Sequence, residues 1–544
     1  MKPIVVKIVN QLLIIFLLSH IFTNGFAENH DNNEVVVLYS QIPLHFNPAI
    51  SLDRNVISAA SNIFVSLVEI DEDWQPVPYL AKKWEISADK LRYTFHLEED
   101  TLFHDGVTLT AQDVKFSIEL FKQNHPLGST MFNSVSQINI LDKDTITIQL
   151  SRPQPAFMLC LAYPLFYILP RHVYENGNIL DHPANIVAVG SGPFKVVDYQ
   201  YGESFVLERF ENYFREGKPY IKKYVGQKYR SLKEAEIAID NGQAHVLNFL
   251  ESVPLANKLE EQSDLVVSRS GYEGFGSLNY LEFNLRKKYF SDKRVRKAIG
   301  SVIDQTFATN MIFRGGAVSN TRPIHSSSSM ITDDMASPEI DFDKANQLLD
   351  EAGFERQEDG IRFKTHLTWM PENNASHNYI QLAEYIKFQL SKLDIDVQLE
   401  PPEDFLSWYI SVSKWEHEMT ISRVFNWGDP ALGIHRLFSS KNIKHRVWSN
   451  TAGLNNKKIT RLLKDAEIEI DTEKRKEIYE QFLTMFDDEQ PYLFFFETPF
   501  FTFFHRNLVG FRRGVWSAVG PYDEVVWEND GQLEQSGTII YLDN

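Results

Sequence analysis

Residues 79–120 read YLAKKWEISADKLRYTFHLEEDTLFHDGVTLTAQDVKFSIEL, and this stretch decides the fold. Within it, residues 91–97 alternate apolar and polar side chains, which predicts a half-exposed β-strand. Asp105-Gly106 is typical of a turn. Thr110 then suits the N-cap of a helix. The apolar side of that helix would hold Val114, Ile118 and Phe121. The stretch therefore predicts a strand, a turn and an amphipathic helix in succession.

Outward from this stretch, strand-like and helix-like segments alternate along the whole chain. Residues 35–38 (VVVL) read as a short buried strand, and residues 144–150 as a second half-exposed strand. Helices are predicted over 291–303 and 341–353, and Gly353 suits the position just after the second of them. The alternation favours an α/β fold.

The N-terminus has the features of a secretory signal peptide. Lys2 and Lys7 are basic, residues 12–18 (LLIIFLL) form a short apolar run, and Gly25-Phe26-Ala27 offers small residues for cleavage. The run is too short for a spanning helix. Residues 1–27 are therefore predicted to be a signal peptide that directs the chain to the periplasm. An uncleaved N-terminal anchor is the alternative.

Length and charge narrow the classes of protein further. The 544 residues exceed one ordinary core, so two or three domains are expected. The formal net charge is −19, and it becomes −21 without the two lysines of residues 1–27. Phosphate binding needs clustered cations, so this balance argues against a nucleic-acid partner. No later apolar run is long enough to span a membrane, so the mature chain is expected to be soluble.

Signatures of catalysis are missing from the sequence. No Gly-x-Ser-x-Gly elbow or Walker loop occurs, and Gly274-Phe275-Gly276 lacks the third glycine of a dinucleotide site. His417-Glu418 has no second histidine at the zincin spacing, and the 16 histidines show no metal-type pattern. The single cysteine, Cys160, lies in an apolar run and is expected to be buried and inert. We therefore expect no enzyme, no cofactor and no metal site.

The chain resembles the family 5 extracellular solute-binding proteins, the oligopeptide- and dipeptide-binding class of ABC importers. The resemblance is carried first by residues 79–120. Further blocks then match over nearly the whole mature chain. These blocks are Asn47-Pro48, 62–68, 190–194 (GSGPF), Phe283-Asn284, 290–299, 343–354 and 426–430 (NWGDP).

The resemblance implies an α/β, two-lobed periplasmic binding protein of the large type (class II), with an extra subdomain inserted in the first lobe. Its lobes would close on a ligand as a hinged clamp. The chain would cross between lobes near Gly271–Gly276 and near Thr498-Pro499. The predicted limits are 28–70 with 190–272 and 500–544 for lobe I, 71–189 for the inserted subdomain, and 273–499 for lobe II.

Two departures from the family pattern bear on the ligand. Peptide binders of the family have an Asp at the position of Asn426, where it pairs with the ligand's free amine, and a neutral Asn is a weaker partner. Dipeptide binders carry an Arg soon after a Met-Pro, whereas Met370-Pro371 is followed here by Glu372, Asn373 and Asn374. These differences argue against a dipeptide specialist.

Candidate ligand-binding residues follow from position in the matched blocks. Asp429 has a structural alternative, the N-cap of the next turn. Glu273 and Phe275 lie in the glycine-rich crossover. The predicted set is Phe46, Asn47, Glu273, Phe275, Trp369, Asn426, Trp427 and Asp429.

The leading hypothesis is a monomeric periplasmic binding component that delivers a peptide-type solute to an inner-membrane ABC permease. The same fold could instead bind a nickel chelate, haem, a sugar or an opine. A secreted hydrolase would need a nucleophile or metal site. A periplasmic chaperone or signalling receptor would use the same clamp without transport.

Overall fold

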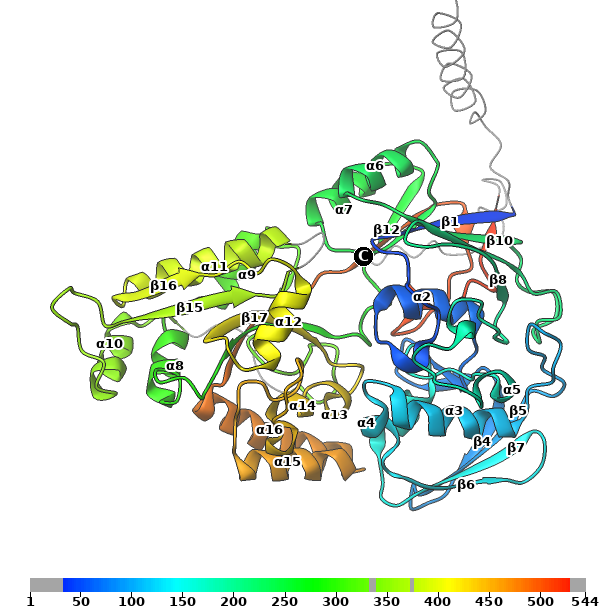
Figure 1. Cartoon of the computed structure of the whole chain (residues 1–544), viewed down its shortest axis with the longest axis horizontal. Coiled ribbons are helices and arrows are strands. Elements are labelled where there is room, and N and C mark those ends of the chain that lie inside the picture. The colour runs from blue at the N-terminus through cyan, green and yellow to red at the C-terminus, as the bar shows by residue number, and fades with distance from the viewer. Residues whose placement is uncertain (1–32, 332–338, 372–375, 529–544) are drawn as a thin grey trace, which may run out of the picture.

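The computed structural model describes residues 33–331, 339–371 and 376–528. The predicted signal peptide and the polar stretch after Gly531 lie outside these residues. Two large mixed sheets divide the described chain into two lobes, seen on the right and the left of Figure 1. We call the right-hand one lobe I and the left-hand one lobe II. Among the described residues, no helix has both the length and the apolar character needed to span a bilayer.

Lobe I is built on seven strands in the order β12-β19-β11-β1-β10-β9-β8. β1 pairs in parallel with β10 and β11, and the other neighbours are antiparallel. The strands are β1 (Glu34–Tyr39), β8 (Phe194–Gln200), β9 (Ser204–Arg209), β10 (Lys223–Lys228), β11 (Val246–Leu250), β12 (Leu265–Ser268) and β19 (Phe501–His505).

The VVVL run forms β1, as predicted, and its continuous apolar character follows from its central place. Val35 and Val37 pack in the core on the side of helix α2 (Arg54–Ile63). Val36 and Leu38 pack in the core on the opposite side, which α6 (Leu232–Asp240) and α7 (Val253–Glu260) cover. Both faces of β1 are therefore covered, so neither set of side chains is polar.

Lobe II is built on six strands in the order β14-β18-β13-β17-β15-β16, with β15 parallel to β16 and β17. The strands are β13 (Ser277–Phe283), β14 (Val318–Ser319), β15 (Phe363–Trp369), β16 (Ile395–Leu399), β17 (Met419–Phe425) and β18 (Tyr492–Glu497). The helices are α8 (Lys293–Gly300), α9 (Gln305–Phe313), α10 (Phe342–Glu351), α11 (Ser376–Ser391), α12 (Phe405–Ser413), α13 (Pro430–Gly433), α14 (His435–Phe438), α15 (Lys457–Ile468) and α16 (Thr472–Glu489).

The stretch that opened the sequence analysis forms part of a small four-stranded sheet and the helix beside it. Its order is β4 (Ala81–Ile86), β5 (Arg92–Leu97), β7 (Thr145–Leu150) and β6 (Val135–Ile140). Thr110 caps α3 (Ala111–Asn124) in a capping box: its Oγ1 accepts from the Gln112 N–H, and Asp113 Oδ2 accepts from the Thr110 N–H at 2.9 Å. The predicted strand, turn and helix are confirmed.

The remaining strands and α-helices of the described chain are short. They are β2 (Val68–Ile70), β3 (Pro76–Pro78), α4 (Gly128–Phe132), α5 (Arg171–Tyr174), β20 (Leu508–Val509) and β21 (Val526–Trp527).

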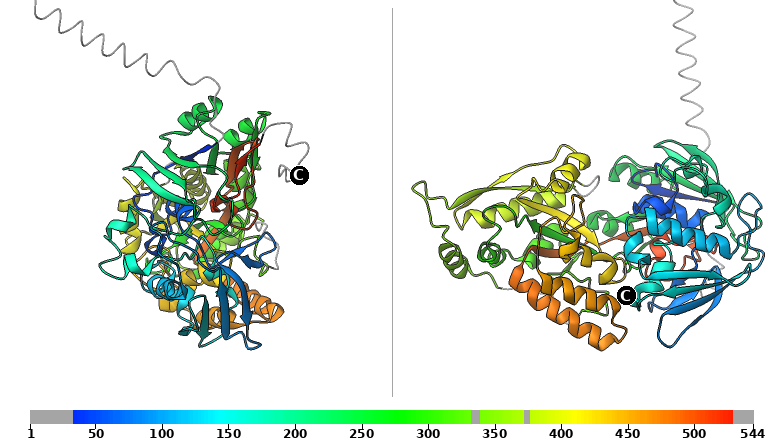
Figure 2. Two further views of the ribbon diagram at one scale, coloured as in Figure 1. Left: turned by 90° about the vertical axis from the view of Figure 1, so that its right-hand side faces the viewer. Right: turned by 60° about the horizontal axis from the view of Figure 1, so that its bottom comes forward.

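The chain passes between the two large sheets twice. One passage joins β12 to β13 through residues 269–276, and the other joins β18 to β19 through residues 498–500. The small sheet lies at the end of lobe I that faces α15 and α16, as the right-hand view of Figure 2 shows. There Arg152 Nη2 lies 2.5 Å from Glu467 Oε1 of α15. The exact limits of the predicted lobes and subdomain stay a prediction.

A buried charge cluster fastens the C-terminal segment to lobe I. Arg512 contacts Glu69 at 2.8 Å and Asp523 at 2.6 Å, and Arg215 lies 3.3 Å from the same aspartate. Burial raises the pKa of Glu69, and the charge of Arg512 acts in the opposite direction. Two guanidinium groups thus face two enclosed carboxyl groups, which compensates for their burial.

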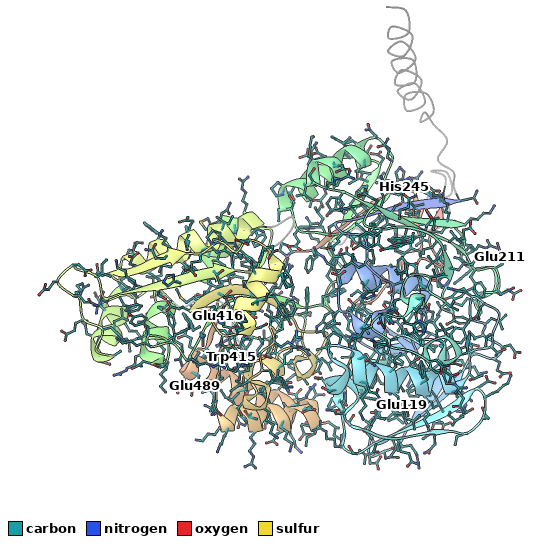
Figure 3. All side chains as sticks on the ribbon, in the orientation of Figure 1. Glu119, Glu211, His245, Trp415, Glu416 and Glu489 are labelled. Carbon is teal, nitrogen blue, oxygen red and sulfur yellow. The ribbon has the colours of Figure 1, made fainter. Side chains whose placement is uncertain are left out.

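Two further polar side chains, one in each lobe, are hydrogen-bonded within the protein. Figure 3 labels His245 in lobe I and Glu489 in lobe II. His245 Nδ1 accepts from the Val36 N–H at 3.0 Å, and Glu489 Oε1 accepts from Asn456 Nδ2 at 3.0 Å. Such bonds offset the cost of taking polar groups out of water.

Candidate ligand-binding site at the lobe junction

The glycine-rich crossover 269–276 brings lobe I against the end of β17. The Asn426 N–H donates to the carbonyl oxygens of Phe275 and Gly276 at 2.9 and 3.0 Å. Gly276 has a left-handed φ of +54°, and a Cβ there would lie 2.9 Å from Asn426 Cβ. A Cβ at Gly274 would lie 2.2 Å from the indole nitrogen of Trp516. The two glycines therefore permit the close approach of the crossover to both neighbours.

The loop 426–429 turns sharply after β17. Trp427 and Gly428 both have left-handed φ angles, +54° and +77°. A Cβ at Gly428 would lie 3.0 Å from the Trp74 ring and 3.3 Å from the Trp516 ring. We call the crossover 269–276, this loop, Trp74 and Trp516 the lobe junction.

Asp429 has the structural role that the sequence offered as its alternative. Its Oδ1 accepts from the Ala431 N–H at 2.8 Å and caps α13. The Arg475 guanidinium holds both carboxylate oxygens, at 2.7 and 2.8 Å. Burial alone would raise the pKa of Asp429, but the charge and hydrogen bonds of Arg475 bring it below its ordinary value. The carboxylate is thus fully used within the protein.

Three other buried polar atoms of the junction are not hydrogen-bonded within the protein. Asn426 Oδ1, Trp427 Nε1 and Trp516 Nε1 have no hydrogen-bond partner among the described residues. Each side chain is no more than 2% exposed. They offer one acceptor and two donors, all neutral. A buried polar atom without a partner costs about 1–3 kcal/mol, so these atoms are candidates for contact with a ligand. Other buried atoms of the described residues share this state, among them Ser191 Oγ and Gln305 Oε1, but they do not lie between the lobes.

Charged side chains from both lobes meet near the same loop. Glu251 lies between Arg54 of α2, at 2.8 Å, and Arg423 of β17, at 3.3 Å. Burial raises the pKa of Glu251, but the two arginines outweigh it and the net pKa lies below the ordinary value. An ionised carboxylate therefore joins the lobes through two guanidinium groups.

Two aromatic side chains of lobe II lie next to the ion pair of Arg423 and Glu251. Trp448 Nε1 donates to the Arg423 carbonyl oxygen at 2.8 Å, and its ring stacks on Phe405 of α12 with centroids 6.4 Å apart. Phe405 is 45% exposed. Aromatic and arginine side chains together suit the binding of an organic solute.

The sequence-predicted residues fall into two groups. Phe275, Asn426 and Trp427 meet at the junction, where the Phe275 and Trp427 ring centroids are 5.6 Å apart. Glu273 belongs to the same crossover, and its Oε2 accepts from the Gly271 N–H at 2.9 Å.

The remaining predicted residues have contacts within one lobe. Phe46 is enclosed against Tyr199 and Phe205 in lobe I. Asn47 caps a short 3-10 turn and donates to Asn185 Oδ1 at 2.8 Å. Trp369 is 6% exposed and packs in a core of lobe II. Ligand contact by any of the predicted residues stays a prediction.

Sequence reasoning missed several side chains of this site, among them Glu251, Arg423, Trp448 and Trp516. Arg423 lies three residues before Asn426, so the matched block could have drawn attention to it. Glu251 and Trp516 carry no local signal, because each reaches the site through contacts distant in sequence. Glu372, Asn373 and Asn374 lie outside the described residues.

A cavity of about 210 Å³ lies beside the crossover in lobe I. Its lining includes Asn248, Glu273, Arg512 and Tyr522.

Across the described ranges, no group of three or more His, Cys, Asp or Glu side chains has an arrangement that could hold a metal ion. The junction therefore offers hydrogen bonds, aromatic surface and guanidinium groups for recognition.

Two lobes joined by two crossings, with unused hydrogen-bonding groups between them, define a two-lobed binding protein. The family profile described as "Bacterial extracellular solute-binding proteins, family 5 Middle" matches residues 75–445. The chain belongs to this family of solute-binding proteins of ABC importers, as the sequence resemblance predicted.

Individual relatives cover most of the chain. "Heme-binding protein A" of Haemophilus influenzae is 26% identical, over 86% of this chain and 87% of the relative. "Dipeptide-binding protein" of Escherichia coli is 25% identical, over 86% of this chain and 90% of the relative. The crystal structure of NikZ from Campylobacter jejuni in complex with Ni(L-His) has a TM-score of 0.78 at 23% identity, and covers 91% of this chain and 99% of that one. These relatives are solute-binding proteins, and the structural likeness extends the two-lobed fold over the described chain.

Proposed function

We propose that this protein is the periplasmic substrate-binding component of an ABC importer. A signal peptide at residues 1–27 would export it. It would act as a monomer, capture a peptide-type solute between its lobes and deliver it to an inner-membrane permease. The observation that carries the proposal is the set of unused donors and acceptors at Asn426, Trp427 and Trp516, which lie where the lobes meet.

Closure supplies the transport signal in this proposal. Arg423 of lobe II contacts Glu251 of lobe I, so part of the interface is made from groups that separate when the lobes open. A solute that bonds to both lobes stabilises the closed form by its differential affinity for it. The permease would then recognise the closed form.

A second candidate is capture of a non-peptide solute by the same closure. It is favoured by the neutral Asn426 where peptide binders of the family have an Asp, and by relatives named for haem and found with Ni(L-His). The two candidates share fold and mechanism and differ only in the chemistry of the solute.

Native mass spectrometry of the mature protein from a periplasmic fraction tests the proposal. The complex is then denatured and the released molecule identified. A ladder of peptides supports a peptide solute, and a single non-peptide species supports the second candidate.

The doubly substituted W427F/W516F protein should retain less of the molecule than the wild type. W408F is the matched control, because Trp408 Nε1 already donates to Thr420 Oγ1 at 2.9 Å inside lobe II. If no solute is retained and none raises the melting temperature in a broad screen, capture is contradicted.

A further inference from the structure

One arginine of lobe II is enclosed by the protein without a carboxylate partner. Arg436 of α14 donates from Nε to the Gly433 carbonyl oxygen at 2.9 Å, and it forms no ion pair with any described residue. Arg475, by contrast, lies 2.7 Å from Asp429. Burial lowers the pKa of Arg436 to about 10, although solvent reaches part of the side chain. A guanidinium group in such surroundings is unfavourable until an anion binds it.

A second cation lies close to Arg436, beside the contact between the lobes. The charge of Arg446 lowers the pKa of Arg436 further, because like charges repel. Arg446 is exposed, and its Nη2 donates to the carbonyl oxygen of Pro126, just before α4, at 3.0 Å. Helix α13, which directly precedes α14, also packs against α4 (Figure 1). Both arginines therefore lie near the place where lobe II meets the small subdomain of lobe I.

The nearby chain offers no free carboxylate to these two arginines. Residues 430–464 contain eight lysines and arginines and no Asp or Glu, although the whole chain has a formal net charge of −19. The carboxylate of Glu282 on β13 is engaged within lobe II. Its Oε1 lies 3.1 Å from His417 Nε2, and its Oε2 accepts from Thr451 Oγ1 at 2.9 Å. The positive charge of Arg436 and Arg446 is thus left without a local counter-charge.

A hydroxyl group of the lobe II sheet stands beside Arg436. Tyr280 of β13 lies opposite Ser422 of β17 in the sheet, and both side chains are 2% exposed. Burial raises the pKa of Tyr280, whereas the Ser422 hydroxyl and the charge of Arg436 act in the opposite direction. Tyr280 therefore keeps its proton at neutral pH and can donate it in a hydrogen bond. A phenol and two guanidinium groups together supply the donors that an oxyanion needs.

This inference rests on the proposed function and concerns the charge of the solute. We propose that Arg436, Arg446 and Tyr280 form a subsite for an oxyanion group of the captured solute, either a carboxylate or a phosphate. Arg436 holds the oxyanion through its N–H groups, and Tyr280 donates a hydrogen bond from its hydroxyl. Arg446 adds a second positive charge at the edge of the lobe contact. The enclosed guanidinium group then has the partner that the protein itself does not supply.

Simple anions test this subsite on the ligand-stripped mature protein. Sodium phosphate and sodium acetate are each compared with sodium chloride at equal ionic strength and pH 7. At least one oxyanion should raise the melting temperature of the wild type, and the larger rise tells whether phosphate or carboxylate fits better. R436M should bind that anion at least about tenfold more weakly, and Y280F should weaken binding by a smaller factor. R461Q is the matched control, because the Arg461 side chain is 85% exposed on α15.

The stability of R436M separates a binding role from a structural one. Removing an enclosed charge without a counter-ion should leave the anion-free protein at least as stable as the wild type. A lower melting temperature of anion-free R436M would assign Arg436 to the fold and overturn the inference. Equal effects of the oxyanions on wild type, R436M and Y280F, or no effect on the wild type, would overturn it as well.

The molecule released in native mass spectrometry tests the link to the solute. A released solute with an acidic group, retained less by R436M than by R461Q, supports the inference. A released solute without an acidic group would overturn the inference and leave solute capture standing. If the wild type retains no solute but an oxyanion stabilises it and not R436M, the anion site stands and the proposed function fails.

Discussion

The Arg512 cluster of lobe I and the lobe junction both bury polar side chains, but they treat them differently. In the cluster, Arg512 and Arg215 face Glu69 and Asp523, and each charge has an opposite partner. At the junction, Asn426, Trp427 and Trp516 each retain an atom without a partner among the described residues. The difference separates groups that hold the fold from groups that a ligand can use, because an unbonded buried atom is costly until something binds it.

The largest effect is expected from breaking the cluster. R512M leaves Glu69 and Asp523 enclosed with too little positive charge, and it should lower the free energy of unfolding by about 3–5 kcal/mol. Urea unfolding at pH 7 measures this. The neighbouring R513M is the control: its side chain is 50% exposed and lies 3.7 Å from Glu72, so it should cost no more than about 1 kcal/mol. Equal losses in the two variants would show that the cluster is not the critical contact.

A second effect concerns His104, which joins residues 103–106 to the GSGPF turn. Its Nδ1 accepts from the Gly190 N–H at 3.1 Å, so Nε2 carries the proton and donates to the Gly192 carbonyl at 3.1 Å. Burial lowers the pKa of His104 to about 4. The folded state therefore binds fewer protons than the unfolded chain between about pH 4 and 6.5, and stability falls as the pH falls through that window.

For His104 this loss amounts to about 2 kcal/mol between pH 7 and pH 5. H104Q removes the titration, so its free energy of unfolding should fall less between these pH values than that of the wild type. Urea unfolding of both proteins at pH 7 and 5 provides the comparison. Parallel losses would assign the pH dependence to other groups.

A smaller effect on stability is expected from the difference between an indole N–H that is hydrogen-bonded and one that is not. Trp408 Nε1 is bonded to Thr420 Oγ1, whereas Trp427 Nε1 has no partner among the described residues. W408F should therefore lose about 1 kcal/mol more stability than W427F in the ligand-free protein, beyond the similar loss of ring volume. Thermal and urea unfolding of ligand-stripped proteins measure the difference. A W427F protein as destabilised as W408F would mean that its indole is bonded in solution.

The smallest effect is expected at the rim, where Arg152 contacts Glu467 across the lobes. Their side chains are 34% and 27% exposed, so the pair contributes only about 0.2–1 kcal/mol. R152E or E467R should shift the ligand-free protein toward an open form, seen as a larger radius of gyration in small-angle X-ray scattering. The double reversal R152E/E467R should restore the wild-type value. D488K, which breaks contacts inside lobe II, is the control.

Local sequence signals predicted individual elements well. Thr110 caps α3, and Gly353 has a left-handed φ of +83° just after α10, as predicted for both positions. Cys160 is fully buried, as its apolar surroundings indicated. These outcomes depend on neighbours a few residues away, so the sequence contains the relevant information.

The candidate site was predicted only in part. Asn426 and Trp427 were recognised from the matched block, but the role of Asp429 depended on Arg475, which lies 46 residues further on. Glu251 meets Arg423 across 172 residues and Arg54 across 197. No propensity or spacing rule reaches over such separations, since these partners meet only when two sheets form and the chain crosses between them.

By itself, the sequence determined the α/β elements, their caps and the membership of the solute-binding family. All three rest on short motifs whose physics is local. The tertiary structure decided which polar groups are hydrogen-bonded within the protein and which can bind a ligand. A hydrogen-bond partner is fixed by where distant segments of the chain lie. It joined Asp429 to Arg475 and Glu251 to two arginines, and it left Asn426, Trp427 and Trp516 with capacity for a ligand.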